Sequence, residues 1–348
     1  MVNRKVVALV LAVSLGFAPQ GAMAQTVNQL FEQGNAAQAQ GRFAEAERVF
    51  RQVLQAEPNN TVAHYNLGLA LRKQGNLTAA IASYRRALQI DPNNAAAHNN
   101  LGLALYQQGN LTAAIASYRR ALQIDPNYAF AHYNLGLALK DQGNLEAAIA
   151  SYRRALQIDP NDAFAHNNLG NALSDQGKLA EAIASYRRAL EIDPNDAIAH
   201  NNLGFALSDQ GKLAEAIASY RRALQIDPNY AIAHNNLGIA LSDQGNLEAA
   251  IASFQRALQI DLNYTDAHIG LGNALSEQGN LEAAIASFQR ALQIDPNYAL
   301  AHNNLGFALY TQGKLDEAIA SYRRALEIDP NHTRARNNLR NALRDQNN

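Results

Sequence analysis

The segment Ala95–Tyr128, AAAHNNLGLALYQQGNLTAAIASYRRALQIDPNY, recurs with small changes every 34 residues through almost the whole chain. Nine repeats occupy residues 27–60, 61–94, 95–128, 129–162, 163–196, 197–230, 231–264, 265–298 and 299–332. Residues 333–348 form a further half-repeat, which we expect to be a capping helix. Each repeat in such a chain packs only on its neighbours. The sequence therefore predicts one array, with no room for a separate catalytic domain of about 100 residues.

Helix-breaking residues divide each repeat into two predicted helices. Residues 96–108 contain no helix breaker except Gly102, and Gly109 follows where a helix would end in a left-handed residue. A second helical stretch covers residues 111–124 and stops at Asp125-Pro126. Each repeat is thus expected to be a helix, a tight turn, a second helix and a second turn.

Small and apolar residues recur at fixed places in the repeat and at about 100° per residue fall on one side of each helix. In the quoted repeat they are Leu101, Gly102, Leu105, Gly109, Ala114, Tyr118, Ala121 and Pro126. Small residues at Gly102 and Ala114 allow two helices to approach closely.

These residues resemble the signature of the tetratricopeptide repeat family over about nine-tenths of the chain. His98 departs from it, since the family usually carries tryptophan or another large residue there. The resemblance implies an all-α fold, a right-handed α-solenoid (superhelix) of helix-turn-helix repeats. It also implies that the first helix of each repeat lines a concave groove.

Asparagines recur on the opposite face of the first helices in two neighbouring rows. The first row, which we call the ladder, consists of Asn66, Asn100, Asn134, Asn168, Asn202, Asn236, Asn304 and Asn338 and is broken by Gly270. The second, which we call the adjacent row, contains Asn99, Asn167, Asn201, Asn235 and Asn303. Asparagine is a mediocre helix former, but its amide offers the donor and acceptor that complement a peptide bond.

The ladder is similar to the asparagine ladder in the tetratricopeptide superhelix of the O-linked N-acetylglucosamine transferases, although no catalytic domain accompanies it here. That resemblance implies that the ladder holds the backbone of an extended peptide, and we expect the adjacent row to bind the same peptide. The alternative is structural: the amides bond to one another or to helix carbonyls, or were copied during repeat duplication.

Side chains beside the ladder are expected to set the preference for a partner. The apolar ones are Phe130, Phe164, Ile198, Ile232, Phe205 and Ile239. An acidic row follows along the far edge: Asp141, Asp175, Asp209, Asp243 and Glu277. Because like charges in a groove cost binding energy, we expect a neutral-to-basic protein or peptide segment.

Several other patterns do not indicate a site. Eight histidines recur at one position, but equivalent atoms in successive repeats should lie about 10 Å apart, whereas ligands of one metal ion lie about 2 Å from it. We expect them to pack and to hydrogen-bond across the junction between repeats. There is no cysteine, which excludes thiolate metal sites and disulfides. We expect no metal, no cofactor and no enzymatic activity, since any catalytic set of residues would be repeated several times over.

The N-terminal residues 1–24 are typical of a bacterial-type signal peptide. Arg4 and Lys5 precede the apolar run 6–17, and Ala22-Met23-Ala24 suits a cleavage site. Cleavage after Ala24 is expected; the alternative is a retained anchor, although the run is shorter than the roughly 20 residues of a spanning helix. Cleavage would place the protein in a periplasm or outside the cell, with no stable membrane insertion.

Charge and the C-terminal end complete the sequence-based expectations. Loss of the two basic residues of the signal leaves 27 Lys and Arg against 30 Asp and Glu, a net charge of −3 that does not favour nucleic acid. In the last helix Arg334, Arg336, Arg340 and Arg344 are expected to form a solvated outer face.

The sequence thus predicts an exported, non-enzymatic protein–protein interaction scaffold that is monomeric or weakly self-associating. Two alternatives remain at this stage: a self-assembling structural repeat protein, and the regulatory arm of a separate enzyme.

Overall fold

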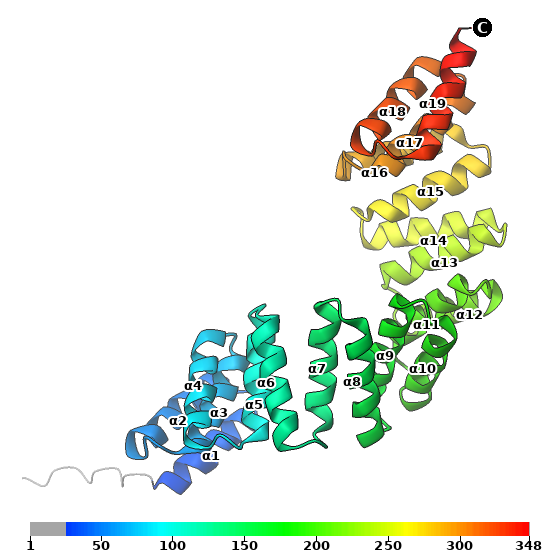
Figure 1. The fold of residues 1–348 in the computed structure, drawn as a ribbon. Helices are drawn as coiled ribbons and strands as arrows, with labels where there is room; N and C mark the ends of the chain where they lie inside the picture. The colour runs from blue at the N-terminus through cyan, green and yellow to red at the C-terminus, as the bar shows by residue number, and fades with distance from the viewer. Residues whose placement is uncertain (1–25, 348) are drawn as a thin grey trace, which may run out of the picture. The chain divides into compact units, whose positions relative to one another are not determined.

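A computed structural model describes residues 26–347, and in this part of the chain every regular element is an α-helix. Nineteen helices follow one another (Figure 1). The first helices of the repeats are α1 (Val27–Ala39), α3 (Thr61–Lys73), α5 (Ala95–Gln107), α7 (Ala129–Asp141), α9 (Ala163–Asp175), α11 (Ala197–Asp209), α13 (Ala231–Asp243), α15 (Thr265–Glu277) and α17 (Ala299–Thr311). The second helices are α2 (Phe43–Ala56), α4 (Leu77–Ile90), α6 (Leu111–Ile124), α8 (Leu145–Ile158), α10 (Leu179–Ile192), α12 (Leu213–Ile226), α14 (Leu247–Ile260), α16 (Leu281–Ile294) and α18 (Leu315–Ile328), and α19 (Thr333–Gln346) ends the chain.

The helices form two compact blocks. The N-terminal block contains α1–α6 and ends at Pro126, and the C-terminal block contains α7–α19 and begins at Asn127. Within each block the two helices of a repeat pack on each other, and the second helix also packs on the first helix of the next repeat. The predicted all-α solenoid class is confirmed.

Capping residues set the ends of the helices. At the start of α5 the side-chain oxygen of Asn94 accepts a hydrogen bond from the backbone N–H of Ala97 at 2.9 Å. After α5, Gly109 has φ 83°, and the backbone N–H of Asn110 donates to the carbonyl of Leu105 at 2.9 Å. The glycine permits the left-handed turn at no steric cost, so the next helix folds back on the first.

A glycine–aromatic contact fixes the close approach of the two helices in a repeat. A Cβ atom at Gly102 would lie 2.7 Å from Cε1 of Tyr118, so the tyrosine ring occupies the place of a side chain. The ring is buried, as are Ala114 and Ala121 on either side of it. The predicted buried face is therefore confirmed, and residue size at these positions determines the helix separation.

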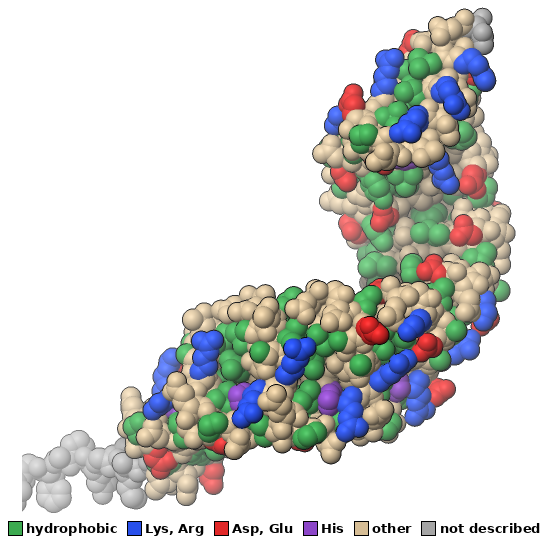
Figure 2. Space-filling view, viewed as in Figure 1, with side chains coloured by type: hydrophobic (Ala, Val, Ile, Leu, Met, Phe, Trp, Pro, Cys, Tyr) green, Lys and Arg blue, Asp and Glu red, His purple; other side chains and the backbone are tan. Residues whose placement is uncertain are grey.

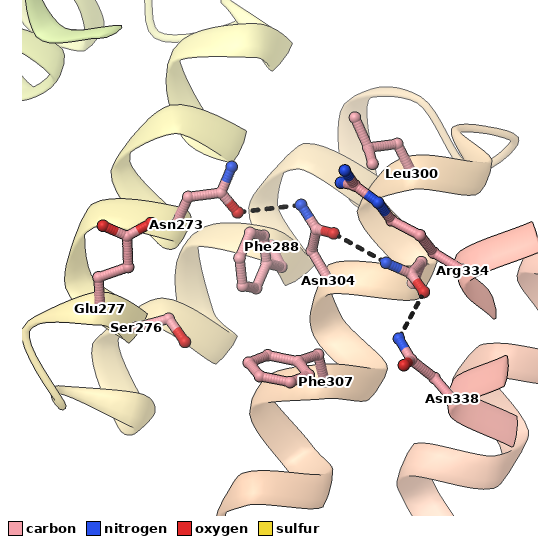
Figure 3. A pocket seen from close by; sticks show the side chains of 10 residues that line it. Asn273, Ser276, Glu277, Phe288, Leu300, Asn304, Phe307, Arg334 and Asn338 are labelled. Carbon is pink, nitrogen blue, oxygen red and sulfur yellow. Dashed lines mark hydrogen bonds between the residues drawn. The ribbon is translucent and has the colours of Figure 1, made fainter. Parts of the chain in front are cut away.

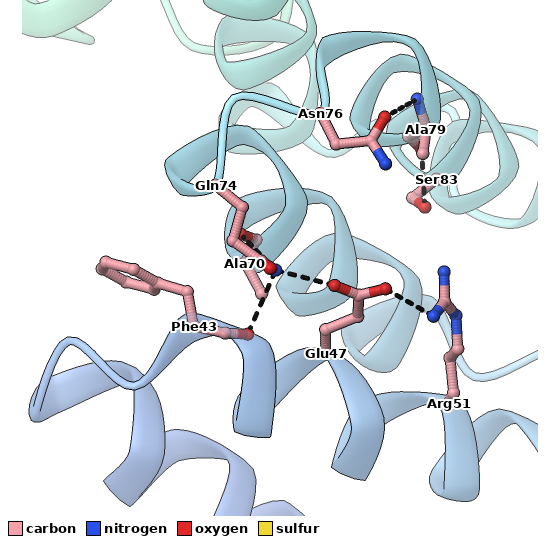
Figure 4. Close-up of polar contacts among 8 residues, drawn as sticks. All are labelled: Phe43, Glu47, Arg51, Ala70, Gln74, Asn76, Ala79 and Ser83. Carbon is pink, nitrogen blue, oxygen red and sulfur yellow. Dashed lines mark hydrogen bonds and ion pairs between the residues drawn. The ribbon is translucent and has the colours of Figure 1, made fainter.

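Polar contacts support the first junction between repeats (Figure 4). The Gln74 amide, at the end of α3, donates to the carbonyl oxygen of Phe43 at 3.3 Å and to the carboxylate of Glu47 at 2.7 Å. The same carboxylate is ion-paired with Arg51. One side chain thus joins α3 to the start of α2.

None of the helices described here is both long and apolar enough to cross a lipid bilayer. The expected signal peptide, residues 1–24, lies outside the described residues.

Candidate binding face

The ladder asparagines are half-buried, and hydrogen bonds tie most of them to the preceding repeat. In the N-terminal block the Asn66 amide donates to Asn35 Oδ1 at 3.3 Å, and the Asn100 amide donates to the Tyr65 hydroxyl at 3.0 Å. The ladder therefore has a structural function, one of the two alternatives above.

The C-terminal block repeats this arrangement. The Asn168 amide donates to the Tyr133 hydroxyl at 3.1 Å and the Asn202 amide to Asn167 Oδ1 at 3.2 Å. Further along, amide donors of Asn236, Asn304 and Asn338 reach oxygens of Asn201, Asn273 and Asn303 at 3.1, 2.9 and 3.0 Å. Asn168 and Asn202 each donate a second hydrogen bond, to the carbonyl of Phe164 at 2.9 Å and to Asn171 Oδ1 at 3.1 Å, so the capacity left for a ligand lies on the amide oxygen, which can accept twice.

The adjacent row differs from the expectation that it contacts a peptide. Asn99, Asn167, Asn201, Asn235 and Asn303 are buried, between 4% and 8% exposed. Asn167, Asn201 and Asn303 accept hydrogen bonds from the ladder amides of the following repeats. Because this position points into the junction between repeats, we assign the row to support of the ladder.

Tyrosine takes the place of the adjacent row in two repeats, at Tyr65 and Tyr133. Burial raises the pKa of both hydroxyls. The phenols therefore stay neutral at physiological pH, and each accepts from a ladder amide while keeping its own O–H to donate.

The ladder gap at Gly270 leaves a polar atom without a partner. By the pattern of the neighbouring repeats, Asn235 Oδ1 would accept from a ladder amide at position 270. That position is a glycine, and this buried oxygen has no hydrogen-bond partner among the described residues. The Phe254 ring fills the space instead, since a Cβ at Gly270 would lie 2.4 Å from its Cε1.

Exposed apolar side chains flank the ladder in the C-terminal block. One row contains Phe130, Phe164, Ile198, Ile232 and Leu300, and the other contains Phe205, Ile239 and Phe307. Their exposed fractions lie between 36% and 70%, although burying such side chains stabilises a fold by about 1.5–3 kcal/mol each. Figure 2 shows apolar and acidic side chains side by side over α13–α15. A row of unburied apolar side chains is typical of an interaction surface.

The acidic row lies at the ends of the first helices. Asp141, Asp175, Asp209, Asp243 and Glu277 are all exposed. Lys140 lies 3.5 Å from Asp175 and partly compensates its charge. No ion pair to another described residue involves Asp209 or Asp243, so this part of the face keeps its negative charge.

A pocket of about 510 Å³ opens on the same face between α15, α17 and α19 (Figure 3). Its lining includes Leu300 and Phe307 of the apolar rows, Asn304 of the ladder, Glu277 of the acidic row and Arg334. Arg334 was expected on a solvated outer face of the last helix. It is exposed, but it lies on the ladder face, because α19 continues the series of first helices.

The recurring histidines make hydrogen bonds across the junction between repeats, as predicted. The Nε2–H of His98 donates to the carbonyl of Pro92 at 3.1 Å, and that of His200 to Pro194 at 3.1 Å. Burial lowers the pKa of His98, His200, His234 and His268. Within residues 26–347 no group of His, Cys, Asp and Glu could hold a metal ion.

Sequence reasoning gave hydrogen bonds between amides as an alternative but did not identify the partners in the preceding repeat. The available signal was the pair of successive asparagines in one repeat, because the second asparagine of a pair lies 35 residues after the first asparagine of the preceding repeat. It also missed Arg334 as a residue of the ladder face, although its place in the half-repeat equals that of Leu300 in the last full repeat.

Family models match nearly the whole array. A TPR repeat model matches residues 68–109, 103–143, 138–177, 170–210, 206–245, 240–279 and 272–313. Tetratricopeptide repeat models also match residues 37–82 and 299–332. The chain belongs to the tetratricopeptide repeat family, and its helix pairs form a scaffold suited to protein–protein interaction.

Solved structures of other proteins are similar to this chain, and two of them have TM-scores above 0.5. The APC/C hetero-tetramer Cut9-Hcn1 has a TM-score of 0.59 and 16% identity, covering 91% of this chain and 76% of that chain. Pseudomonas aeruginosa pilF has a TM-score of 0.53 and 22% identity, covering 63% and 97%. YrrB, described as a TPR protein with an unusual peptide-binding site, is 27% identical and covers 53% and 95%, with a TM-score of 0.45. No curated protein sequence matches the chain.

Proposed function

We propose that this chain is an exported, non-enzymatic scaffold whose ladder face in the C-terminal block binds extended, neutral-to-basic protein segments. The observation that carries the proposal is the pairing of two exposed apolar rows with a ladder of half-buried amides between them. Apolar side chains supply binding energy, and the amides can pair with backbone groups of the segment.

The acidic row supports the basic character of the partner. Asp209, Asp243 and Glu277 keep exposed carboxylates beside the apolar rows, and complementary charge raises the rate of association. At the corresponding places in α3 and α5 the chain has Lys73 and Gln107 instead of an acidic residue. We therefore assign the binding of basic segments to the C-terminal block alone.

The test is a selection of 12-residue peptides from a random library against the protein, followed by measurement of their affinities. Replacing Phe164, Ile198 and Phe205 together by Gln should weaken the selected peptides at least tenfold. Those side chains are largely exposed, so the melting temperature should change little. Leu262→Gln is the matched control, because Leu262 is 62% exposed but lies in a turn away from the ladder. Equal affinity of the triple variant and the control would reject the proposal.

Export is the second part of the proposal and rests on residues 1–24. N-terminal sequencing of protein recovered from a bacterial periplasm or culture medium should start at Gln25. Recovery of the full-length chain from the cytosol alone would contradict export while leaving the peptide-binding proposal intact.

A further inference from the structure

Two opposite charges line the pocket between α15, α17 and α19 without pairing with each other. Glu277 at the end of α15 and Arg334 near the start of α19 both contribute to its wall, on opposite sides in Figure 3. No ion pair or hydrogen bond to a described residue involves either side chain. A pair with only a structural function would be expected to lie in contact, whereas these two charges remain available to a ligand.

The lining of the pocket also contains apolar side chains. Leu300, Phe307 and the ring of Phe288 contribute to its lining. Leu300 is 36% and Phe307 51% exposed, so a side chain that entered here would bury apolar surface of both. The pocket thus suits an apolar side chain with a charged group on either side of it.

The amides in the pocket are already connected to one another. Asn304 donates to Asn273 at 2.9 Å and accepts from Asn303 at 3.0 Å, and Asn338 donates to Asn303 at 3.0 Å (Figure 3). This chain of hydrogen bonds fixes the amide orientations before any ligand binds, which lowers the entropic cost of binding.

Charged residues near the pocket continue its separation of negative and positive charge along the ladder face. The other three arginines of α19 are occupied: Arg336 donates to the carbonyl of Pro330, Arg340 to Asn337, and Arg344 pairs with Asp345. Before Glu277, the acidic row continues with Asp243 and Asp209 in the two preceding repeats. The ladder face therefore changes from negative over α11–α15 to positive at Arg334.

We infer that this pocket binds an apolar side chain of a bipolar protein segment, with a basic group against Glu277 and an acidic group against Arg334. The inference rests on the proposed function and narrows it, since the segment is basic along most of its length and acidic at the α19 end. The two charges thereby determine the orientation in which the segment lies along the array.

The probe is a fluorescein-labelled 12-residue peptide of glycine and serine with one lysine, a central leucine and one glutamate. Three relatives carry Gln for the lysine, Gln for the glutamate, or Ser for the leucine. Affinities of all four are measured for the full chain and for Glu277→Gln and Arg334→Gln. Glu282→Gln and Arg340→Gln are matched controls on α16 and α19, outside the pocket.

The expected result is selective coupling, read from double-mutant cycles between protein and peptide. Glu277→Gln should weaken the parent peptide about twofold to fivefold, the range for exposed ion pairs, and should leave the peptide without lysine unchanged. Arg334→Gln should likewise weaken the parent peptide about twofold to fivefold and leave the peptide without glutamate unchanged. The leucine-to-serine peptide should bind most weakly of the four.

Other results would overturn the inference in recognisable ways. Peptide binding that depends on Asn202 and Asn236 but shows no charge coupling would leave the proposed function standing and remove the bipolar pocket. Binding of free leucine with no gain from the peptides would indicate a small-molecule zwitterion site instead. No binding of any probe would show that the pocket does not take such segments.

Discussion

At the residue scale, an asparagine side chain can stabilise the junction between repeats or bind a ligand. The hydrogen bonds that it makes in the structure distinguish these two functions. Asn201 shows the first use: its oxygen accepts from Asn236 at 3.1 Å inside the junction between repeats. Asn235 occupies the same place one repeat later, but its oxygen has no partner among the described residues because Gly270 offers no donor. In the next repeat the position is Ile269, which is buried, so an apolar side chain fits there.

This comparison predicts unequal costs for one substitution at two equivalent sites. Asn235→Ile removes an oxygen without a partner and should change stability little or raise it, because an unpaired buried polar group is itself unfavourable. Asn201→Ile leaves the Asn236 amide without its acceptor and should cost about 1–3 kcal/mol. Hydrogen exchange of the amides in α11 and α13 measures both variants. Equal losses of protection would show that the gap at Gly270 has no energetic consequence.

At the element scale, the sequence predicts the helices well because each repeat carries the same pattern of apolar residues and the same residues at the ends of its helices. A glycine of positive φ follows each first helix, and an aspartate ends the second helix in every repeat except the first. The ladder face was predictable from spacing alone, since positions 96, 100 and 103 share one side of a helix. The burial of the adjacent row was not, because it depends on the path of the next helix, and periodicity in one helix carries no information about its neighbour.

We expect the histidines in the junctions between repeats to make the stability of the protein depend on pH. Burial lowers the pKa of His98, His200, His234 and His268, and nearby arginines lower it further, against the opposing effect of a backbone hydrogen bond. In the unfolded chain histidine titrates near 6.5, so as the pH falls below about 7.5 the unfolded state takes up protons first. The contribution of these neutral histidines to the free energy of unfolding is therefore fully present above that range. It is lost as the pH falls toward the folded-state pKa.

We expect a lower melting temperature at pH 5.5 than at pH 7.5, measured by circular dichroism. Replacing these four histidines by Gln keeps an N–H donor but removes the titration, so the difference between the two pH values should shrink. The remaining carboxylates titrate mostly below this window. A pH dependence as large in the Gln variant as in the parent would assign the effect to other groups.

At the scale of the whole molecule, an array of near-identical repeats predicts that stability is a sum of repeats and junctions. The junctions are nevertheless unequal. Most carry a ladder hydrogen bond, whereas the junction of α13 with α15 has Gly270 and an unpaired oxygen in its place. Removing one whole repeat therefore changes both the number of junctions and their quality.

Two deletions of 34 residues separate these contributions. Deleting residues 197–230 places Asn236 against Asn167, which restores a ladder bond but loses one repeat and the exposed Arg187–Glu215 pair. Deleting residues 265–298 removes Gly270 and places Asn304 against Asn235, so the oxygen without a partner gains a donor. Both products should stay helical, with lower urea m-values because less surface is exposed on unfolding.

The second deletion should leave the more stable protein, by about 1–3 kcal/mol, since it also satisfies a buried acceptor. Urea unfolding followed by circular dichroism gives the comparison. Deletion of residues 197–212 is the control, because it removes α11 alone and sets the second helices α10 and α12 in succession, with no first helix to cover their apolar faces. If that half-repeat deletion folds as well as the whole-repeat deletions, the 34-residue period does not organise the packing. If the two whole-repeat deletions are equally stable, a ladder bond to Asn235 adds nothing to the stability of its junction.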